Sequence, residues 1–309
     1  MTLAACRVCL SRDIELQAVL RRLPVYIWPL PEGQVHEFAD AELNLCRRCG
    51  HLQLQDFPKE FFPKLYAHEP FNLEDAAENL QRRDRLESAL GAGFFKGKRV
   101  LDVGGGRNSF AALLSSSESW VADFSVAPEV KAAVARAIEG DILEAALPPA
   151  YFDAICLFHC LEHINHPAEL VGALKDLLSP GGQVLVELPN APEVIARMPY
   201  YAVFHQHVSL FSLESLDRLF ARGGLIRTGL LRADGVILAS YGVGSVVPDS
   251  LPQSEGKRHA ELLRQRLHEL EQGLRGLRFD PEPKKVGLYG AGGSASLFLA
   301  HFPWLAQRI

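Results

Sequence analysis

Apolar stretches of strand length alternate with helix-like periods over the middle of the chain. Short apolar runs that are typical of buried strands occur at residues 98–103, 120–123, 152–158 and 183–188. Helical patterns occur near 127–138, 167–178 and 212–222. Because a strand, a crossover helix and a second strand produce parallel pairing, this alternation predicts an α/β fold with a parallel sheet and helices on both faces.

Further elements flank this middle part. An amphipathic pattern predicts a helix over 74–90, and residues 233–247 predict one or two late strands. A long helix is predicted over 255–278, where leucines recur at steps of four and three: Leu263, Leu267, Leu270, Leu274 and Leu277. This seam is shorter than the ~3–4 heptads of a coiled coil, so we interpret it as docking on another surface, with a homodimer partner as one candidate.

The N-terminal part of the chain carries two Cys-x-x-Cys pairs. They consist of Cys6, Cys9, Cys46 and Cys49. Each pair places two thiolates on one turn, and two pairs complete a tetrahedral Zn²⁺ site, which favours zinc over four unrelated thiols. Since the thiolates fill all positions around the metal, we expect the zinc to be structural. The intervening stretch holds strand-like pieces at 25–28 and 43–45, which predict a hairpin-like insert.

Length, charge and hydropathy narrow the class of protein. The 309 residues leave room for a zinc module at 1–62, an α/β core at 63–248, and a long helix with an incomplete α/β segment at 249–309. A net charge of −5 does not favour nucleic acid as a partner. The apolar runs are shorter than the ~18 residues of a membrane helix, and the N-terminus lacks a signal-peptide pattern. We therefore expect a cytoplasmic protein without a membrane partner.

A glycine turn follows the first strand of the α/β part. Leu101-Asp-Val is followed by Gly104, Gly105 and Gly106, and Asp123 closes the next strand. A dinucleotide fingerprint would have glycine at position 109, where the helix and strand pack around a pyrophosphate, but the chain has Ser109. The turn therefore favours a nucleoside-carrying cofactor without phosphates.

The turn Asp102-x-Gly104-x-Gly106 resembles motif I of class I methyltransferases that use S-adenosylmethionine (SAM). Residues 152–163 and 177–190 resemble the fourth strand with its His-x-Leu-Glu-His ending, and the next helix end and strand, of the same enzymes. The resemblance implies a Rossmann-like sheet of the class I methyltransferase type, preceded by the zinc module. It also implies SAM contacts from Asp102, Gly104, Gly105, Gly106, Asp123, Phe124, Asp141, Ile142, Phe158 and His159.

Within that resemblance, Asp123 takes both ribose hydroxyls, and Gly140-Asp141-Ile142 matches the stretch that reads adenine. A metal site at His159 and His163 is an alternative, because imidazoles four residues apart face the same way. No third ligand is evident in the sequence, so packing at the strand end is the better interpretation of these two histidines.

The zinc module and the segment 204–212, Phe-His-Gln-His-Val-Ser-Leu-Phe-Ser, resemble the zinc-containing sugar C-methyltransferases of antibiotic deoxysugar pathways. The family's catalytic base falls on His207. His205 is a weaker candidate, since on a strand it would point to the same face, and Tyr66 is a candidate contact for substrate or SAM. The chain has Gln206 where the family has Glu, and Leu210 where the family has Tyr.

The last segment, from Lys285 to Ala295, fits the Gly-x-Gly-x-x-Ala form of the dinucleotide fingerprint. Only 14 residues follow Ala295, which are too few for a second strand with its ribose-binding acid. The segment resembles the start of the sugar methyltransferases' C-terminal domain, cut short.

These observations leave three functions open. The first is SAM-dependent C-methylation of an activated keto-deoxysugar or related small keto compound, through an enolate formed by a histidine base. The second is O- or N-methylation of a small natural product, which needs a weaker base. The third is a catalytically idle scaffold that keeps the SAM fold for partner binding. The first two imply a small-molecule acceptor, with a nucleotide-linked sugar as one candidate.

Overall fold

The computed structural model describes residues 5–26, 37–56, 76–106, 108–114, 118–233, 235–276 and 293–307. The chain forms two compact units. Unit 1 comprises Met1–His68, Asn190–Ser212 and Gln253–Ile309, and unit 2 comprises Glu69–Pro189 and Leu213–Pro252. The predicted boundaries after residues 62 and 248 treat each part as one continuous stretch, whereas the structure groups residues 190–212 with the N-terminal and C-terminal parts.

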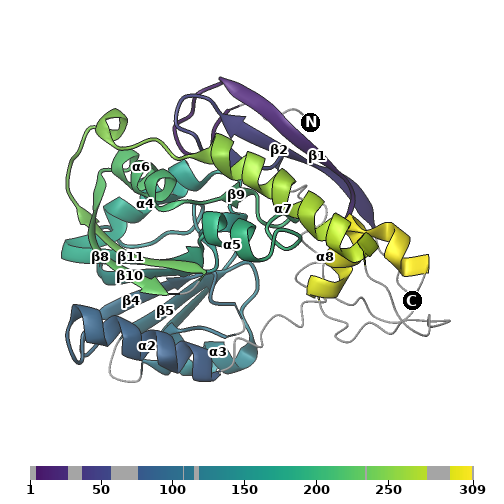
Figure 1. Cartoon of the computed structure of the whole chain (residues 1–309). Helices are drawn as coiled ribbons and strands as arrows, with labels where there is room; N and C mark the ends of the chain where they lie inside the picture. The colour runs from purple at the N-terminus through teal and green to yellow at the C-terminus, as the bar shows by residue number, and fades with distance from the viewer. Residues whose placement is uncertain are drawn as a thin grey trace. The chain divides into compact units, whose positions relative to one another are not determined.

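Unit 2 contains a sheet of seven strands (Figure 1). In spatial order they are β10 (Leu225–Ala233), β11 (Val236–Val243), β8 (Leu178–Pro189), β7 (Phe152–Phe158), β4 (Arg99–Val103), β5 (Glu118–Asp123) and β6 (Arg136–Glu139). The strands from β6 to β8 are parallel, and β11 and β10 add an antiparallel hairpin. The chain runs outward from β4 in one direction and returns to β7 on its other side, which creates a topological switch point between them.

Helices cover both faces of this sheet. In Figure 1, α2 (Ala76–Leu90) and α3 (Pro128–Ala133) lie on one side of the strands, and α4 (Pro167–Leu177) and α6 (Leu213–Arg222) on the other. Short 3-10 turns occur at Ala111–Leu113, Leu161–His163 and Pro248–Ser250. The predicted α/β fold with a class I methyltransferase-like sheet is thereby confirmed.

Two predictions of secondary structure were wrong in part. The helix expected over 127–138 ends at Ala133, and its second half is the edge strand β6, which pairs with β5 from Trp120↔Arg136 to Asp123↔Glu139. Sheet pairing there overrides the helical propensity of the Ala-rich sequence. The late strand pair begins at Leu225 rather than 233, because β10 belongs to the hairpin as well.

Unit 1 contains a smaller antiparallel sheet in the order β1 (Ile14–Pro24), β2 (Phe38–Cys46), β3 (Leu52–Gln53) and β9 (Ser209–Leu210). The predicted fold-back between the cysteine pairs is present as the hairpin β1–β2. Its first strand is Ile14–Pro24 and not 25–28: Val25 and Tyr26 follow the strand, and residues 27–28 lie outside the described ranges.

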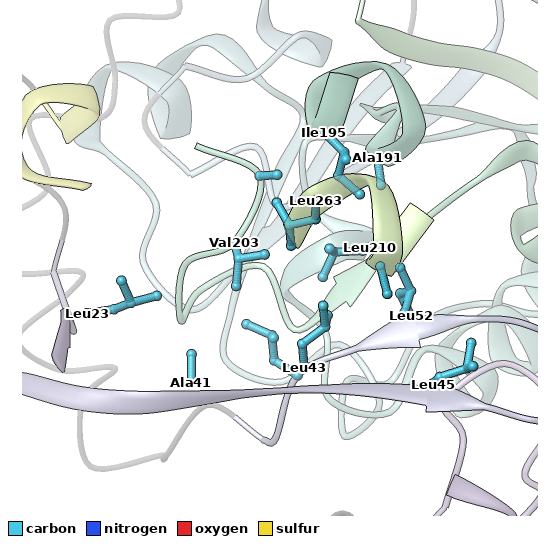
Figure 2. Close-up of a cluster of buried hydrophobic side chains, with 13 residues drawn as sticks. Leu23, Ala41, Leu43, Leu45, Leu52, Ala191, Ile195, Val203, Leu210 and Leu263 are labelled. Carbon is cyan, nitrogen blue, oxygen red and sulfur yellow. The ribbon is translucent and has the colours of Figure 1, made fainter. Parts of the chain in front are cut away.

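The core of unit 1 forms where the hairpin meets helices from distant parts of the sequence. Figure 2 shows Leu43 and Leu45 of β2 near Leu263 of α7 (Gly256–Gly276) and Ile195 of α5 (Ala191–Arg197). Leu267 packs against the same cluster. The leucine seam of α7 thus docks within its own unit over the first part of its length, and the homodimer stays a prediction.

The remaining described elements of unit 1 are α8 (Gly293–His301) and a 3-10 turn at Pro303–Gln307. The start of the fingerprint-like segment, up to residue 292, lies outside the described residues. Within the described ranges, no helix combines the length and apolar character needed to cross a membrane.

Candidate functional site

Three consecutive glycines after β4 make a turn that other residues would disrupt. Gly104 has a φ of +83°, and an added Cβ there would lie 2.8 Å from Cys160 Sγ. An added Cβ on Gly105 would lie 2.5 Å from Asp102 Oδ2, and one on Gly106 would lie 2.9 Å from Asp123 Oδ2. A side chain at position 104 would therefore collide with Cys160, and side chains at positions 105 and 106 would collide with the two acids. We call Asp102, Gly104, Gly105, Gly106 and Asp123 the glycine cradle.

Asp102 shapes the cradle from inside. Its side chain is buried, and Oδ2 accepts hydrogen bonds from Ser109 Oγ at 2.6 Å and from the Ala111 amide at 3.3 Å. Ser109 therefore anchors the turn to the start of the next segment. In the sequence, Ser109 served only to exclude a pyrophosphate site, and its contact with Asp102 was not predicted. The available signal was a hydroxyl donor seven residues after an acid in a buried strand.

Asp123 closes the cradle at the end of the neighbouring strand. Its Oδ2 accepts from the Gly106 amide at 2.9 Å and its Oδ1 from the Ser125 amide at 3.3 Å. Burial raises the pKa of this carboxyl, while the amide hydrogen bonds oppose the shift. Each carboxylate oxygen accepts more than one hydrogen bond, so Asp123 retains capacity for two ribose hydroxyls.

The next residues offer apolar and polar surface beside the cradle. Phe124 is 51% exposed directly after Asp123. Asp141 follows β6, and its Oδ1 accepts from the Leu143 amide at 3.0 Å, while Ile142 is half-buried. These residues share the carboxyl edge of adjacent parallel strands, where ligands of open α/β sheets bind. Acids, bare backbone and an exposed aromatic ring fit the ribose, amino-acid tail and adenine of SAM.

Phe158 and His159 end β7 beside the cradle strand. The ring of Phe158 is buried, and its centroid lies 5.0 Å from that of Phe110. The Arg82 guanidinium lies 4.9 Å from the centroid of the Phe158 ring. The structure thus places the Phe158 ring in the core, and its predicted contact with SAM stays a prediction. His159 has a φ of +49°, and its amide donates to the Glu187 carbonyl at 2.7 Å.

A buried network of charges holds the His159 ring. Its Nε2 lies 3.3 Å from Glu187 Oε1, and its Nδ1 lies 3.5 Å from Glu162 Oε1. Arg82 Nη2 donates to Glu187 Oε1 at 2.8 Å, and both side chains are almost fully buried. Burial disfavours the imidazolium, but the two carboxylates outweigh it and raise the pKa of His159 to about 10. His159 is therefore a cation at neutral pH.

Sequence reasoning missed Arg82 and Glu187. Arg82 lies in the charged stretch Gln81-Arg-Arg-Asp-Arg of α2, which has the composition of a solvent-exposed helix face. The available signal was Glu187, an acid inside the apolar strand Val184-Leu-Val-Glu-Leu. A carboxylate in a buried strand requires a cation or several donors nearby, so this position predicts a buried partner.

Unit 1 holds the four predicted metal ligands together. The Sγ atoms of Cys6, Cys9, Cys46 and Cys49 all lie within 4.8 Å of one another, and all four residues are buried free thiols. The Cys6–Cys49 and Cys9–Cys46 Sγ distances are 3.6 and 3.4 Å. Tetrahedral zinc with ~2.3 Å bonds separates its sulfurs by ~3.8 Å, so the cluster fits Zn²⁺ closely.

The two histidines proposed as bases differ in their surroundings. Residues 205 and 206 form a turn and not a strand, so His205 and His207 do not share a face by alternation. His205 is buried, its ring nitrogen Nε2 lies 3.2 Å from the Ala39 carbonyl oxygen, and burial lowers its pKa. His207 is half-buried, with its ring centroid 4.0 Å from that of Phe204. Tyr66 lies outside the described residues.

Comparison with known proteins identifies the family. A family model described as a methyltransferase domain matches residues 72–226, half of the chain. The chain is 37% identical over 105 residues to the ubiquinone biosynthesis O-methyltransferase of Xylella fastidiosa strain 9a5c, a match that covers 30% of this chain and 43% of that protein. It is 25% identical over 223 residues to the C-methyltransferase NovU of Streptomyces niveus, which covers 68% of this chain and 51% of NovU.

The chain therefore spans about half the length of these relatives, or less. Among solved structures, the 1,6-didemethyltoxoflavin-N1-methyltransferase of Burkholderia thailandensis is similar with a TM-score of 0.49 and 15% identity, over 63% of this chain and 96% of that one. The residues matched by the family model include the glycine cradle, Asp141 and the residues around His159. From this match and the sheet topology, we conclude that the chain belongs to the methyltransferase domain family and has the class I methyltransferase fold.

Proposed function

We propose that this protein methylates a carbon atom beside the ketone of a small acceptor, an activated keto-deoxysugar or a related keto compound. The similarity to the C-methyltransferase NovU carries this proposal, because it covers 68% of the chain and so reaches well outside the methyltransferase domain match. The similarity to the O-methyltransferase is higher in identity but covers only 30% of the chain.

C-methylation requires a base such as histidine. The carbon beside a ketone becomes nucleophilic only as an enolate, so a base with a pKa near neutrality must remove the α-proton. SAM, when bound, supplies the methyl group. His207 is our candidate for the base, because its ring is half-buried and retains access to solvent. His205 is a poorer candidate, since its ring is buried against the Ala39 carbonyl.

We propose that the glycine cradle holds SAM. The backbone of Gly104 to Gly106 lets the amino-acid tail approach closely, because no Cβ intervenes. Asp123 accepts hydrogen bonds from the ribose hydroxyls, and Phe124 and Ile142 flank the adenine. Asp102 acts indirectly, since its carboxylate is engaged by Ser109 and the Ala111 amide.

We further propose that the four cysteines bind one structural Zn²⁺. Their number fills a tetrahedral shell, which leaves no coordination position for a substrate or an activated water. The amides of Val8 and Cys9 lie 3.4 and 3.5 Å from Cys6 Sγ. These N–H groups stabilise a thiolate at that position, as a metal ligand requires.

Product NMR tests the proposal directly. The protein is incubated with methyl-¹³C SAM and a nucleotide-linked 4-keto-6-deoxysugar, and we expect the labelled methyl on carbon. In D₂O, we also expect deuterium to enter the position beside the ketone. His207→Ala should slow both reactions at least ~100-fold while SAM affinity by calorimetry is retained. His268→Ala, which changes an exposed histidine of α7, is the control.

O-methylation is the second candidate, favoured by the 37% identity to the O-methyltransferase. It predicts the label on oxygen, no deuterium beside a ketone and a small effect of His207→Ala, because a hydroxyl acceptor needs a weaker base. That combination of results would overturn the C-methylation proposal.

A further inference from the structure

Arg7 lies between the two cysteines of the first Cys-x-x-Cys pair, and its side chain points into unit 1. Only 3% of that side chain is exposed. Burial lowers its pKa, while the nearby Asp56 carboxylate opposes the shift and favours the guanidinium. A buried cation is costly unless it is fully hydrogen-bonded. The partners of Arg7 therefore show what the residue is for.

Arg7 donates hydrogen bonds to two parts of unit 1 that lie far apart in the sequence. Its Nη1 donates to the carbonyls of Leu54 at 2.6 Å and Val208 at 2.9 Å. Its Nη2 donates to Asp56 Oδ1 at 2.6 Å, and its backbone amide donates to Gln53 Oε1 at 2.9 Å. One residue of the cysteine loop thus connects the end of β3 to the residue that precedes β9.

The strands that Arg7 connects have a very short ladder. β3 and β9 pair at Leu52↔Leu210 and Gln53↔Ser209. The amide of Leu54 extends this pairing by donating to the Val208 carbonyl at 2.9 Å, and Arg7 donates to the same carbonyl. A two-residue pairing is weak by itself, because few hydrogen bonds offset the entropy of fixing the backbone. Charge-assisted hydrogen bonds from a buried guanidinium strengthen it.

His207 directly precedes Val208, whose carbonyl accepts the hydrogen bond from Arg7. The His207 amide donates to the Phe204 carbonyl at 3.1 Å, and the Val208 amide donates to the Gln206 carbonyl at 3.1 Å. These turn hydrogen bonds and the ring contact with Phe204 link the backbone at Val208 to the direction of the imidazole. The Val208 backbone and the His207 imidazole therefore belong to one hydrogen-bonded turn.

We propose that Arg7 is a positioning residue that holds the Val208 carbonyl and thereby orients the His207 imidazole toward the acceptor. This inference rests on the proposed role of His207 as the base. Arg7 also affects the charge of the cysteine cluster. Four thiolates with one Zn²⁺ carry two net negative charges, and a cation in the same loop offsets part of that charge. The metal loop and the candidate catalytic turn are then one connected structure.

The test compares Arg7→Met, which keeps length and apolar packing but removes every donor of the guanidinium, with Arg7→Lys, which keeps the charge. Arg12→Met, an exposed arginine of the same unit, is the matched control. Asp56→Asn tests the outer ion pair alone, because the Asp56 side chain is 58% exposed. The readouts are zinc content, hydrogen exchange of residues 52–56 and 204–210 by peptide mass spectrometry, and the rate of deuterium entry into the keto sugar.

We expect Arg7→Met to retain zinc and SAM affinity, while the amides of 204–210 exchange at least ~10-fold faster and kcat falls ~10- to 100-fold. Arg7→Lys should recover part of both losses, and the control Arg12→Met should match the wild type. Asp56→Asn, which leaves the two carbonyl contacts of Arg7 in place, should change both readouts less than Arg7→Met does. Unchanged exchange and unchanged kcat in Arg7→Met would overturn the inference. If Arg7→Met fails to fold, Arg7→Lys takes its place in the test. Unchanged hydrogen exchange and unchanged kcat in Arg7→Lys would then overturn the inference.

The two proposals fail in distinguishable ways. If His207→Ala turns over like the wild type, the role of His207 as base is wrong, whatever Arg7 does. If His207→Ala is inactive but Arg7→Met and Arg7→Lys leave exchange and kcat unchanged, only the role of Arg7 is wrong. Hydrogen exchange measures the turn without reference to catalysis, so each proposal has its own evidence.

Discussion

The two units place their chemical groups by different means. Unit 2 has a seven-stranded sheet whose parallel strands end side by side, and the cradle residues follow from those ends. Unit 1 has four strands, of which β3 and β9 are two residues long, and its candidate base lies in a turn. The sheet itself positions the cradle, whereas the segment that carries His207 has single contacts, among them the hydrogen bond from Arg7 to the Val208 carbonyl.

The buried cations reflect the same contrast. Arg82 in unit 2 pairs with the buried carboxylate of Glu187, so removing Arg82 leaves that carboxylate without its closest cation. In unit 1, the Arg7 guanidinium donates to two neutral backbone carbonyls and to Asp56, whose side chain is 58% exposed, so its removal leaves no buried carboxylate unpaired. We therefore expect loss of Arg82 to act on global stability and loss of Arg7 to act on local geometry. Three measurements with unit-resolved readouts test this comparison.

Removal of the metal should have the largest effect, and it should be confined to unit 1. Zinc binding to four thiolates contributes ~10–16 kcal/mol in small metal-dependent folds. With Cys46→Ser, or after chelation, we expect the hairpin β1–β2 to lose its protection from hydrogen exchange. The strands β4 and β7 should stay protected and SAM should still bind, because the parallel sheet has its own core.

Cys156→Ser is the matched control, because Cys156 is an equally buried thiol that belongs to β7. It should leave the zinc content at one ion per chain. Simultaneous loss of protection in both units after chelation would contradict the proposed independence of the cradle, and an unchanged hairpin would contradict a structural role for the metal.

Loss of Arg82 should have the next largest effect, in unit 2. Arg82→Met leaves Glu187 buried without its closest donor, and breaking a buried ion pair in this way costs ~3–5 kcal/mol. We expect urea denaturation to show this loss, with exchange increasing in α2 and β8 while zinc stays bound. The double variant Arg82→Met with Glu187→Leu should recover part of the loss, because no unpaired carboxylate remains.

Arg83→Met is the control, since Arg83 is a more exposed neighbour whose ion pair is with Asp84 on the surface. Exposed pairs contribute ~0–1 kcal/mol, so its stability should be close to the wild type. A double variant as unstable as Arg82→Met alone would show that packing by Arg82, and not its charge, is what matters.

Pattern and motif were sufficient for the parts of the molecule that follow local rules. The sheet could be predicted because its strands are apolar runs between helices, and the cradle because Gly104 needs a positive φ that glycine tolerates. The cysteine cluster could be predicted because two Cys-x-x-Cys pairs have the spacing that is typical of tetrahedral zinc ligands. In each case the sequence signal lies within a few residues of the feature it produces.

The missed features are those that depend on contacts far along the chain. Arg82 and Glu187 are separated by 105 positions, and Arg7 and Val208 by 201. Arg82 occurs in a charged stretch that is typical of an exposed helix face, and the residues next to Arg7 give no indication of its contact with Val208. The edge strand β6 was missed for a related reason, because its Ala-rich sequence becomes a strand only beside β5.

A change of pH is the mildest of these perturbations, since it removes one charge and leaves every side chain in place. The carboxylates of Glu162 and Glu187 outweigh burial and raise the pKa of His159 from 6.5 to about 10. A raised pKa means that the folded state binds the proton more tightly than the unfolded state. The stabilisation is therefore complete below about pH 6.5 and is lost as the pH rises through about 10.

We expect the free energy of unfolding of unit 2, from urea titrations with exchange readout on β7 and β8, to decline across this interval. The variant His159→Gln, which is neutral at every pH, should flatten the decline. Glu187 should cause a loss of stability at acidic pH. Burial raises the pKa of its carboxyl, but hydrogen bonds from His159 and Arg82 outweigh burial and lower the pKa to about 2. Stability should therefore fall as the pH drops from about 4.5 to 2. An alkaline decline that persists in His159→Gln would assign the decline to other groups and would contradict the stabilising role of the His159 imidazolium.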